Sequence, residues 1–169
     1  MSNLNSIIDG QRQFFFSGES KIEDFRRENL EKLKALLNLH EDDILLALKK
    51  DLGKSNLEAY ISEISFLKQE IDFALDNLKE WMKPIREKTP IQAMTAKSYI
   101  LYEPLGVTLI IAPWNYPFQL AIDPLIAAMA SGNTVILKTS SKTKETSKLI
   151  RSILNDYFRK DYIYVVDND

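Results

Sequence analysis

The sequence has 169 residues and no cysteine, with 22 Lys and Arg against 24 Asp and Glu, a formal net charge of −2, and 45% hydrophobic residues. Such a length is typical of one domain or part of a larger one. The balanced charge gives no indication of a basic surface that would bind nucleic acid or an anionic membrane. The missing cysteine excludes disulfides, thiolate metal sites and a thiol nucleophile within these residues.

No segment has the pattern of a targeting signal or a membrane span. The N-terminus lacks a cationic start followed by an apolar run. The apolar stretches are short and interrupted by proline, whereas a spanning helix needs roughly 20 apolar residues. A cytoplasmic location is the default expectation. The single histidine, His40, is expected to be a polar residue between two helices rather than a metal ligand.

Apolar residues at helical spacing predict that the first half of the chain is helical. Four helices are expected, over residues 2–17, 20–38, 41–52 and 56–83. Gly18 and Gly53 follow the first and third, as residues that tolerate positive φ. Ser20, with Glu23 three positions later, has the spacing of a capping box for the second. The fourth carries the stripe Tyr60, Ile61, Ile64, Leu67, Ile71, Ala74, Leu78 and Trp81. Carboxylates such as Glu58, Glu63 and Glu70 are interpreted as salt-bridged or solvated helix surface.

The second half has the pattern of an α/β unit. A polar connector over 84–95 leads to a half-exposed strand at 98–102. The later elements are a strand at 107–111, a helix at 118–130, a strand at 134–138, a helix at 144–159 and a strand at 162–166. The strand at 107–111 is continuously apolar, which predicts burial on both faces of a parallel sheet. Such a βαβαβ unit with right-handed crossovers is the half-module of a doubly wound, Rossmann-like sheet.

The loop Pro113-Trp114-Asn115-Tyr116-Pro117 directly follows the strand at 107–111. It therefore lies at the carboxyl edge of a parallel strand, where open α/β sheets place their ligands. Asn115 offers an uncharged N–H donor of the type that stabilises an oxyanion, and the two aromatic residues offer flat apolar surface. The alternative is that the aromatic rings pack on the core while Asn115 caps the helix that begins near Pro117.

Lys138 ends the strand at 134–138 and is expected at the same sheet edge as Asn115. Its ammonium could hydrogen-bond a ribose or a phosphate, and hydroxyl groups follow at Thr139, Ser140 and Ser141. The alternative is a solvated lysine followed by a Ser/Thr helix cap. Neither a G-x-G-x-x-G motif nor a Walker sequence is present, so glycine-rich phosphate binding has no support here.

Two motifs carry a resemblance to the aldehyde dehydrogenase superfamily. They are E-P-L-G-V-T-L-I-I-A-P-W-N-Y-P at residues 103–117 and S-G-N-T-V-I-L-K at residues 131–138, in the family's order and at its separation. D-L-G-K at residues 51–54 and the stretch 60–64 resemble the class 3 branch, which acts on fatty or aromatic aldehydes. The similarity runs collinearly from about residue 5 to residue 166.

The resemblance implies a role for several residues. Asn115 matches the asparagine whose amide holds the oxyanion of the thiohemiacetal. Ile111, Ala112 and Trp114 match positions on the nicotinamide side of an NAD or NADP cleft, and Lys138 matches the lysine that binds the adenosine ribose hydroxyls. The resemblance also implies an aldehyde substrate and a homo-oligomer, such as a dimer, built with a small bridging sheet that includes the strand at 98–102.

Two positions depart from the family pattern, with Thr139 in place of a proline and Ser141 in place of a glutamate that binds the ribose 2′-hydroxyl. A carboxylate at that position repels a 2′-phosphate and a serine does not. The sequence therefore predicts that this site accepts NADP more readily than the glutamate-bearing members do, and that it binds NAD more weakly than they do.

The expected organisation is a helical region at 1–95, a bridging strand at 96–105 and the first half of an NAD(P)-binding domain at 106–169. In the family, the nucleophilic cysteine, the general-base glutamate and a glycine turn lie C-terminal to this region. The chain is therefore interpreted as the N-terminal portion of an aldehyde dehydrogenase, inactive alone because thiolate attack on the aldehyde cannot occur. The alternative is a truncated, non-catalytic binding or assembly module that pairs with a full-length subunit through an open sheet edge.

Overall fold

The computed structural model describes residues 2–167, with side chains from residue 4 onward. The helices are α1 (Ser2–Ser17), α2 (Glu23–Leu39), α3 (Glu41–Leu52), α4 (Asn56–Ala59), α5 (Phe66–Trp81), α6 (Gln119–Ser131) and α7 (Lys144–Tyr157), with short turns η1 (Glu19–Lys21), η2 (Tyr60–Ser65) and η3 (Ile91–Ala93). The strands are β1 (Ile85–Glu87), β2 (Ser98–Ile100), β3 (Val107–Ile111), β4 (Thr134–Lys138) and β5 (Ile163–Val165). Among residues 2–167, no helix has both the length and the apolar character that a membrane crossing requires.

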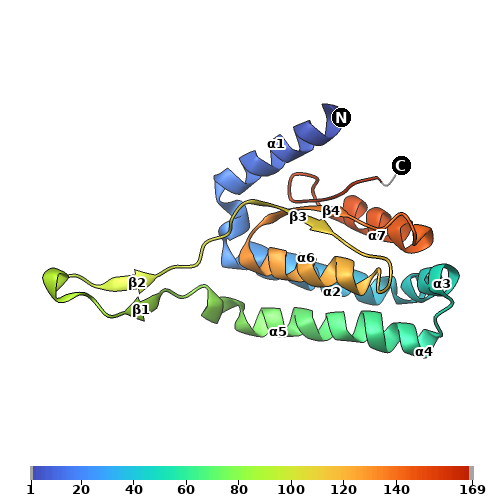
Figure 1. Ribbon diagram of the computed structural model, residues 1–169, viewed down its shortest axis with the longest axis horizontal. Coiled ribbons are helices and arrows are strands. Elements are labelled where there is room, and N and C mark those ends of the chain that lie inside the picture. Colours follow the sequence, from blue (N-terminus) through green and yellow to red (C-terminus); the bar gives the residue numbers. More distant parts are fainter. Residues whose placement is uncertain (1, 168–169) are drawn as a thin grey trace.

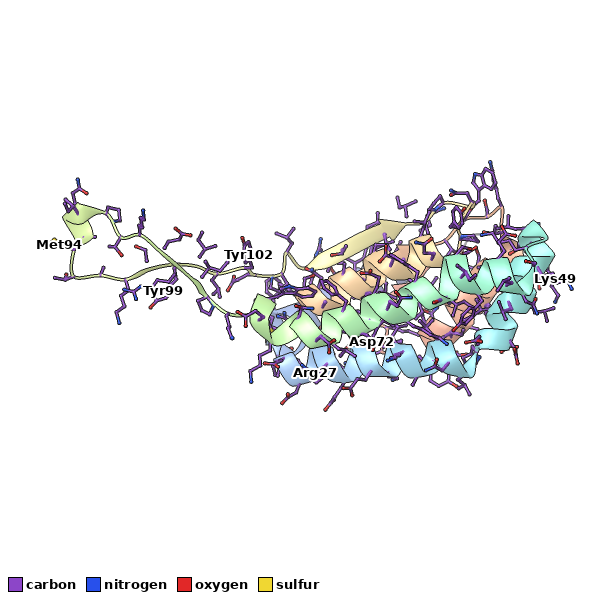
Figure 2. The ribbon with its side chains drawn as sticks, turned by 90° about the horizontal axis from the view of Figure 1, so that it is seen from below. Arg27, Lys49, Asp72, Met94, Tyr99 and Tyr102 are labelled. Carbon is purple, nitrogen blue, oxygen red and sulfur yellow. The ribbon has the colours of Figure 1, made fainter. Side chains whose placement is uncertain are left out.

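The C-terminal half confirms the predicted βαβαβ unit. Strands β3, β4 and β5 form one parallel sheet in that order, with α6 and α7 as the crossovers. Strands β1 and β2 pair antiparallel, with Ile85 opposite Ile100. They form a hairpin that projects away from the body of the molecule (Figure 1). Met94 lies at the far tip of this hairpin, and Tyr99 and Tyr102 lie along it (Figure 2).

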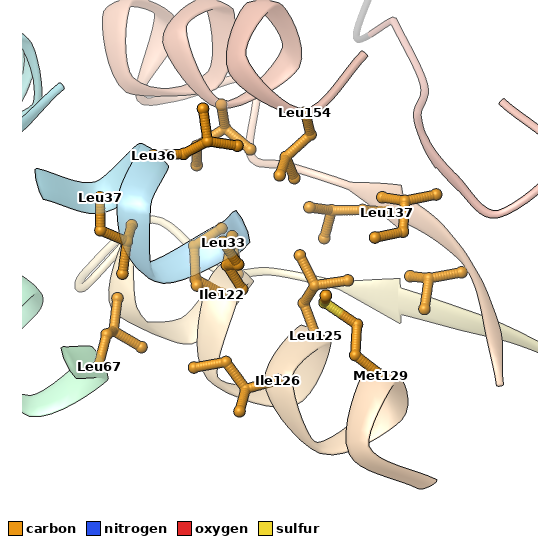
Figure 3. Close-up of a cluster of buried hydrophobic side chains, with 14 of the residues drawn as sticks. Leu33, Leu36, Leu37, Leu67, Ile122, Leu125, Ile126, Met129, Leu137 and Leu154 are labelled. Carbon is orange, nitrogen blue, oxygen red and sulfur yellow. The ribbon is translucent and has the colours of Figure 1, made fainter. Parts of the chain in front are cut away.

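The core lies between the sheet and the N-terminal helices. Helix α6 packs on β3 and β4 on one side and on α2 and α5 on the other. Figure 3 shows the buried side chains that fill this layer. They include Leu33, Leu36 and Leu37 of α2, Leu67 of α5, Ile122, Leu125 and Met129 of α6, Leu137 of β4 and Leu154 of α7. The N-terminal helical half is therefore part of the same core as the sheet.

Two expectations about the N-terminal helices are wrong. Ser20 does not cap α2, which has Ile22 as its N-cap residue. Ser20 is fully buried and its hydroxyl donates to the Gly132 carbonyl at 2.9 Å. The helix expected over 56–83 is interrupted by the π turn η2 between α4 and α5. This wider turn carries Ile61 out of the predicted apolar stripe, leaving it 60% exposed.

Two expectations about the strands are also wrong. Strand β3 is not buried on both faces, although it is the first strand of a parallel sheet. Ile110 is buried, whereas Leu109 and Ile111 on the opposite face are 62% and 67% exposed. The segment at 84–95 is not only a connector, since it contains β1. His40 lies between α2 and α3, as predicted, with Nδ1 3.1 Å from an Asp43 carboxylate oxygen.

Candidate functional site

The sheet brings the loop at 113–117 and the segment that follows Lys138 to the same edge. Ile111 at the end of β3 is opposite Lys138 at the end of β4. The Ala112 amide donates to the Lys138 carbonyl at 2.9 Å, which ties the start of one loop to the start of the other. Beyond this bond, the Lys142 ammonium lies 5.5 Å from the centroid of the Trp114 ring. The expectation that Asn115 and Lys138 share the carboxyl edge is therefore confirmed.

Most of the predicted site residues are open to a ligand. Ile111 is 67% exposed and Trp114 is 50% exposed, and Asn115, Lys138 and Ser141 are also exposed. Ala112 is the exception, at 5% exposure. Within the described residues the Asn115 side-chain amide has no hydrogen-bond partner, so its N–H groups are available to an oxygen atom outside the chain.

The alternative interpretation of the loop at 113–117 is wrong. Trp114 and Tyr116 are 50% and 40% exposed, so the rings do not pack into the core. Asn115 does not cap α6, whose N-cap residue is Phe118 with no side-chain cap of its own. The first amides of α6 bond instead to a residue more than 50 positions earlier in the chain.

That residue is Glu63, which sequence reasoning interpreted as helix surface. Its side chain is fully buried. One carboxylate oxygen accepts from the backbone amides of Phe118 at 2.9 Å and Gln119 at 3.3 Å, and the other is ion-paired with Lys54. A signal was present in the sequence, because Glu63 lies three residues after Tyr60 and four before Leu67. That spacing places it on the buried stripe rather than on the solvated face.

A second carboxylate from the N-terminal half holds α7. Asp51 accepts from the amides of Glu145 at 3.2 Å and Thr146 at 2.7 Å. The alternative of a Ser/Thr cap is therefore wrong, since Thr143 at the N-cap position makes no side-chain cap bond. Carboxylates occupy the N-termini of both α6 and α7, where they satisfy free amides and favour the helix dipole. An anionic ligand at this edge must therefore be held by side chains rather than by these helix ends.

Suitable side chains line a small pocket of about 250 Å³ beyond Lys138. Hydroxyl groups come from Ser140, Ser141 and Ser147, and cations from Lys144, Lys148 and Arg151. Arg151 is ion-paired with Asp167, which lines the same pocket. Hydroxyls and lysine ammoniums suit the hydroxyl and phosphate groups of a nucleotide.

A larger groove of about 940 Å³ lies elsewhere, between α5, α6 and the base of the hairpin. Its apolar lining includes Phe73, Trp81, Tyr102 and Ile126, and Asp123 also faces it. Burial raises the pKa of the Asp123 carboxyl above its ordinary value. None of the predicted site residues lines this groove, so its size does not bear on the site at the sheet edge.

Known proteins resemble this chain in sequence and in fold. The model of the "Aldehyde dehydrogenase family" matches residues 19–166. The 4,4'-diaponeurosporen-aldehyde dehydrogenase of Staphylococcus aureus is 44% identical over 167 residues, which cover 99% of this chain and 36% of that protein. Aldehyde dehydrogenase family 3 member A2 of Macaca fascicularis is 45% identical over 157 residues, which cover 93% of this chain and 32% of that protein.

Among solved structures, the substrate-bound state of Staphylococcus aureus AldH superposes with a TM-score of 0.95 at 41% identity, covering 98% of this chain and 36% of that one. The chain thus spans about a third of the length of the relatives it matches. A further relative is the dimeric, NADP-preferring aldehyde dehydrogenase of Canis lupus familiaris, which is 37% identical over 168 residues, covering 98% of this chain and 37% of that protein. The family model matches most of the chain, and a family 3 enzyme and a solved aldehyde dehydrogenase share its sequence and its fold. The chain therefore belongs to the aldehyde dehydrogenase family and is class 3-like.

Proposed function

We propose that these 169 residues form the oxyanion side and the adenosine side of an NAD(P)-dependent aldehyde dehydrogenase, which oxidises an aldehyde to a carboxylic acid. The observation that carries the proposal is the juxtaposition of the Asn115 loop and Lys138, whose strands end opposite each other at the carboxyl edge of the sheet. Asn115 and Lys138 stand in the family's two motifs, and both side chains are exposed.

Each residue then has a chemical task. The Asn115 amide donates to the oxygen that becomes negatively charged when the aldehyde carbon is attacked. Ile111 and Trp114 provide apolar surface for the nicotinamide ring, and Lys138 donates to the ribose hydroxyls. NAD(P)⁺ supplies the hydride acceptor when bound. The attacking thiolate is not supplied by these residues, which contain no cysteine. We therefore expect no NAD(P)H formation from long-chain or aromatic aldehydes by the purified 169-residue chain.

The pocket beyond Lys138 supports a cofactor preference. Ser141 lies at its wall together with Lys144 and Lys148. A 2′-phosphate placed beside Ser141 meets a hydroxyl and nearby positive charge, whereas a carboxylate at this position would repel it. We propose that the site accepts NADP at least as well as NAD.

Dinucleotide titration tests both parts of the proposal. Trp114 is the reporter, in a Trp81→Phe background that leaves it as the single tryptophan. NAD and NADP should quench its fluorescence, and Lys138→Met should weaken both about tenfold because a charged hydrogen-bond donor is lost. Ser141→Glu should weaken NADP about tenfold relative to NAD.

The control is Ser152→Glu, which adds the same charge on the exposed surface of α7. It should leave the ratio of the two affinities unchanged. An identical NADP-to-NAD ratio in wild type and Ser141→Glu would contradict the preference for NADP. Binding that is unaffected by Lys138→Met would contradict the adenosine site itself.

A second candidate function is a non-catalytic assembly module that pairs with a full-length subunit. It is favoured by the exposed Leu109 and Ile111 on β3 and by the projecting hairpin, where Tyr99 and Tyr102 are 53% and 71% exposed. In a dimer, the hairpin would supply a bridging strand to the partner.

A further inference from the structure

A buried ion pair lies next to the Asn115 loop, where the cation contacts Tyr116 and the anion bonds to the two residues that follow Pro117. Glu63 is fully buried and Lys54 is 9% exposed. The Lys54 ammonium lies 4.1 Å from the centroid of the Tyr116 ring, and Glu63 accepts from the amides of Phe118 and Gln119. Tyr116 directly follows Asn115, and its ring lies against the Lys54 ammonium. After Pro117, the backbone amides of Phe118 and Gln119 donate to the Glu63 carboxylate.

The position of this pair argues for a purpose other than stability. Removing two charges from water is costly, and a buried ion pair is often no more stabilising than apolar residues of the same size. Glu63 lies in the π turn at 60–65, where both it and Ile64 are buried. Such turns are rare and frequently occur at functional sites. Neither charge lines the pocket beyond Lys138.

We infer that Lys54 and Glu63 are positioning residues for Asn115. The cation fixes the ring of Tyr116, and the anion fixes the first turn of α6. The segment between them is short and contains Pro117, whose φ angle is restricted. On the other side of Asn115, the Ala112 amide is bonded to the Lys138 carbonyl. Asn115 therefore lies between two anchored positions, which restricts its backbone at the sheet edge before any ligand binds. The catalytic meaning of this arrangement rests on the proposed role of Asn115, whereas the restraint on the loop is independent of it.

Amide hydrogen exchange in the unmodified chain tests the restraint without a variant. The Phe118 and Gln119 amides lie at the start of a helix, where amides lack partners within the helix. The comparison is with Glu23 and Asp24 at the start of α2, which has no side-chain cap. We expect Phe118 and Gln119 to exchange at least about tenfold more slowly than Glu23 and Asp24 after correction for intrinsic rates. Equal protection would overturn the inference.

Variants then test the link to Asn115. In Glu63→Gln and Lys54→Met, we expect faster exchange at Phe118 and Gln119 and a shift of the Asn115 side-chain amide resonances, with the C-terminal half of α6 unchanged. Lys54→Arg keeps the charge and the contact with the Tyr116 ring, so it should preserve the wild-type resonances. The matched control is Asp51→Asn, because Asp51 is also a carboxylate that caps a helix from a distance. It should affect Glu145 and Thr146 and leave Asn115 unchanged.

Glu63→Gln could instead speed amide exchange uniformly along all of α6 and cause no specific change at Asn115. That result would mean that the ion pair only stabilises the fold, and it would refute a positioning role. The same conclusion follows if Lys54→Arg and Lys54→Met shift the Asn115 resonances equally. Dinucleotide titration reports separately on the proposed function, since Lys138 and Ser141 do not contact the ion pair. Normal binding with an unrestrained loop would therefore reject this inference alone.

Discussion

Gly132 ends α6 with a φ of 85°, and the space a side chain would need is already filled by Arg26. A Cβ atom here would lie 2.6 Å from a guanidinium nitrogen. Arg26 donates to the carbonyls of Ser20, Lys21 and Ala130, so it cannot move without losing bonds. Gly132→Ala should therefore lower the free energy of unfolding by about 1–3 kcal/mol, as measured by urea denaturation.

Gly53 is the matched control, with a φ of 69° and no neighbouring atom within 4 Å of the position that a Cβ would take. Gly53→Ala incurs the backbone strain but meets no neighbour. The difference between the two variants measures the contact with Arg26. Equal losses would mean that Arg26 adjusts freely and that the positive φ alone accounts for the effect.

Tyr162 is 1% exposed, and its hydroxyl has no hydrogen-bond partner among the described residues. Burial raises the pKa of this hydroxyl well above its ordinary value, while the nearby Arg26 acts in the opposite direction. The folded chain therefore keeps a proton that the unfolded chain releases near pH 10. Fewer protons are bound in the unfolded state, so stability falls as the pH rises above about 10.

Tyr162→Phe removes this titrating group. At pH 7 we expect a change within about 1 kcal/mol, because the hydroxyl makes no hydrogen bond that would be lost. Above about pH 10 the variant should lose less stability than the wild type. Urea denaturation at about pH 7 and about pH 10.5 provides the comparison, and parallel losses in the two proteins would contradict burial as the cause.

For single residues, the sequence predicts roles that depend on neighbouring positions, but it does not predict contacts with residues far along the chain. Gly18 and Gly53 follow their helices as expected, because tolerance of a positive φ is a property of glycine itself. Ser20 has the spacing of a local cap, yet its partner is Gly132. Glu63 likewise bonds to α6, far along the chain. No spacing rule reports such partners, since they exist only after the N-terminal helices pack on the sheet.

At the scale of elements, periodicity predicts the helices and strands but not their environment. The apolar run of β3 is typical of a strand with both faces covered, yet Leu109 and Ile111 on one face are exposed, because an apolar run does not report which face other elements cover. Strand β1 has no such pattern, because it is only three residues long, two of them are charged, and all three are exposed. It forms only by pairing with β2. The π turn also has no sequence signal of this kind, since a stripe at three- and four-residue spacing predicts a regular helix.

Helix α1 is joined to the sheet by one polar side chain. Gln11 is fully buried, and its amide nitrogen donates to the carbonyls of Val135 at 2.9 Å and Lys160 at 3.2 Å. Gln11→Met keeps the volume but leaves these carbonyls without their donor. We expect it to lower the free energy of unfolding by about 1–3 kcal/mol and to increase amide exchange in α1.

The control for this change is Gln13→Met, an exposed position two residues along the same helix. Its effect on stability should be within about 0.5 kcal/mol, as for most surface substitutions. Similar stability and exchange for the two variants would show that packing, rather than the Gln11 bonds, holds α1 on the sheet.

The two edges of the parallel sheet differ in how they are covered. The outer side of β5 is occupied at Val165, whose amide donates to Asn155 Oδ1 at 2.9 Å and whose carbonyl accepts from Asn155 Nδ2 at 3.0 Å. Side chains that block an edge in this way discourage pairing with another chain. Strand β3 has no such cover within residues 2–167, and its Leu109 and Ile111 face solvent. In doubly wound sheets, the fourth strand lies beside the first, which is the position next to β3.

The 169-residue chain should therefore self-associate through β3 rather than through β5. The double variant Leu109→Lys, Ile111→Lys places charge on the open strand and should raise the concentration at which association begins by at least about tenfold, as measured by light scattering. The control is Leu39→Lys, Leu57→Lys, which adds the same charge at two helical positions that are 67% and 71% exposed. If both double variants suppress association equally, net charge rather than the β3 surface controls it. A wild-type chain that remains monomeric at all concentrations would favour an independent module over a surface that requires a partner.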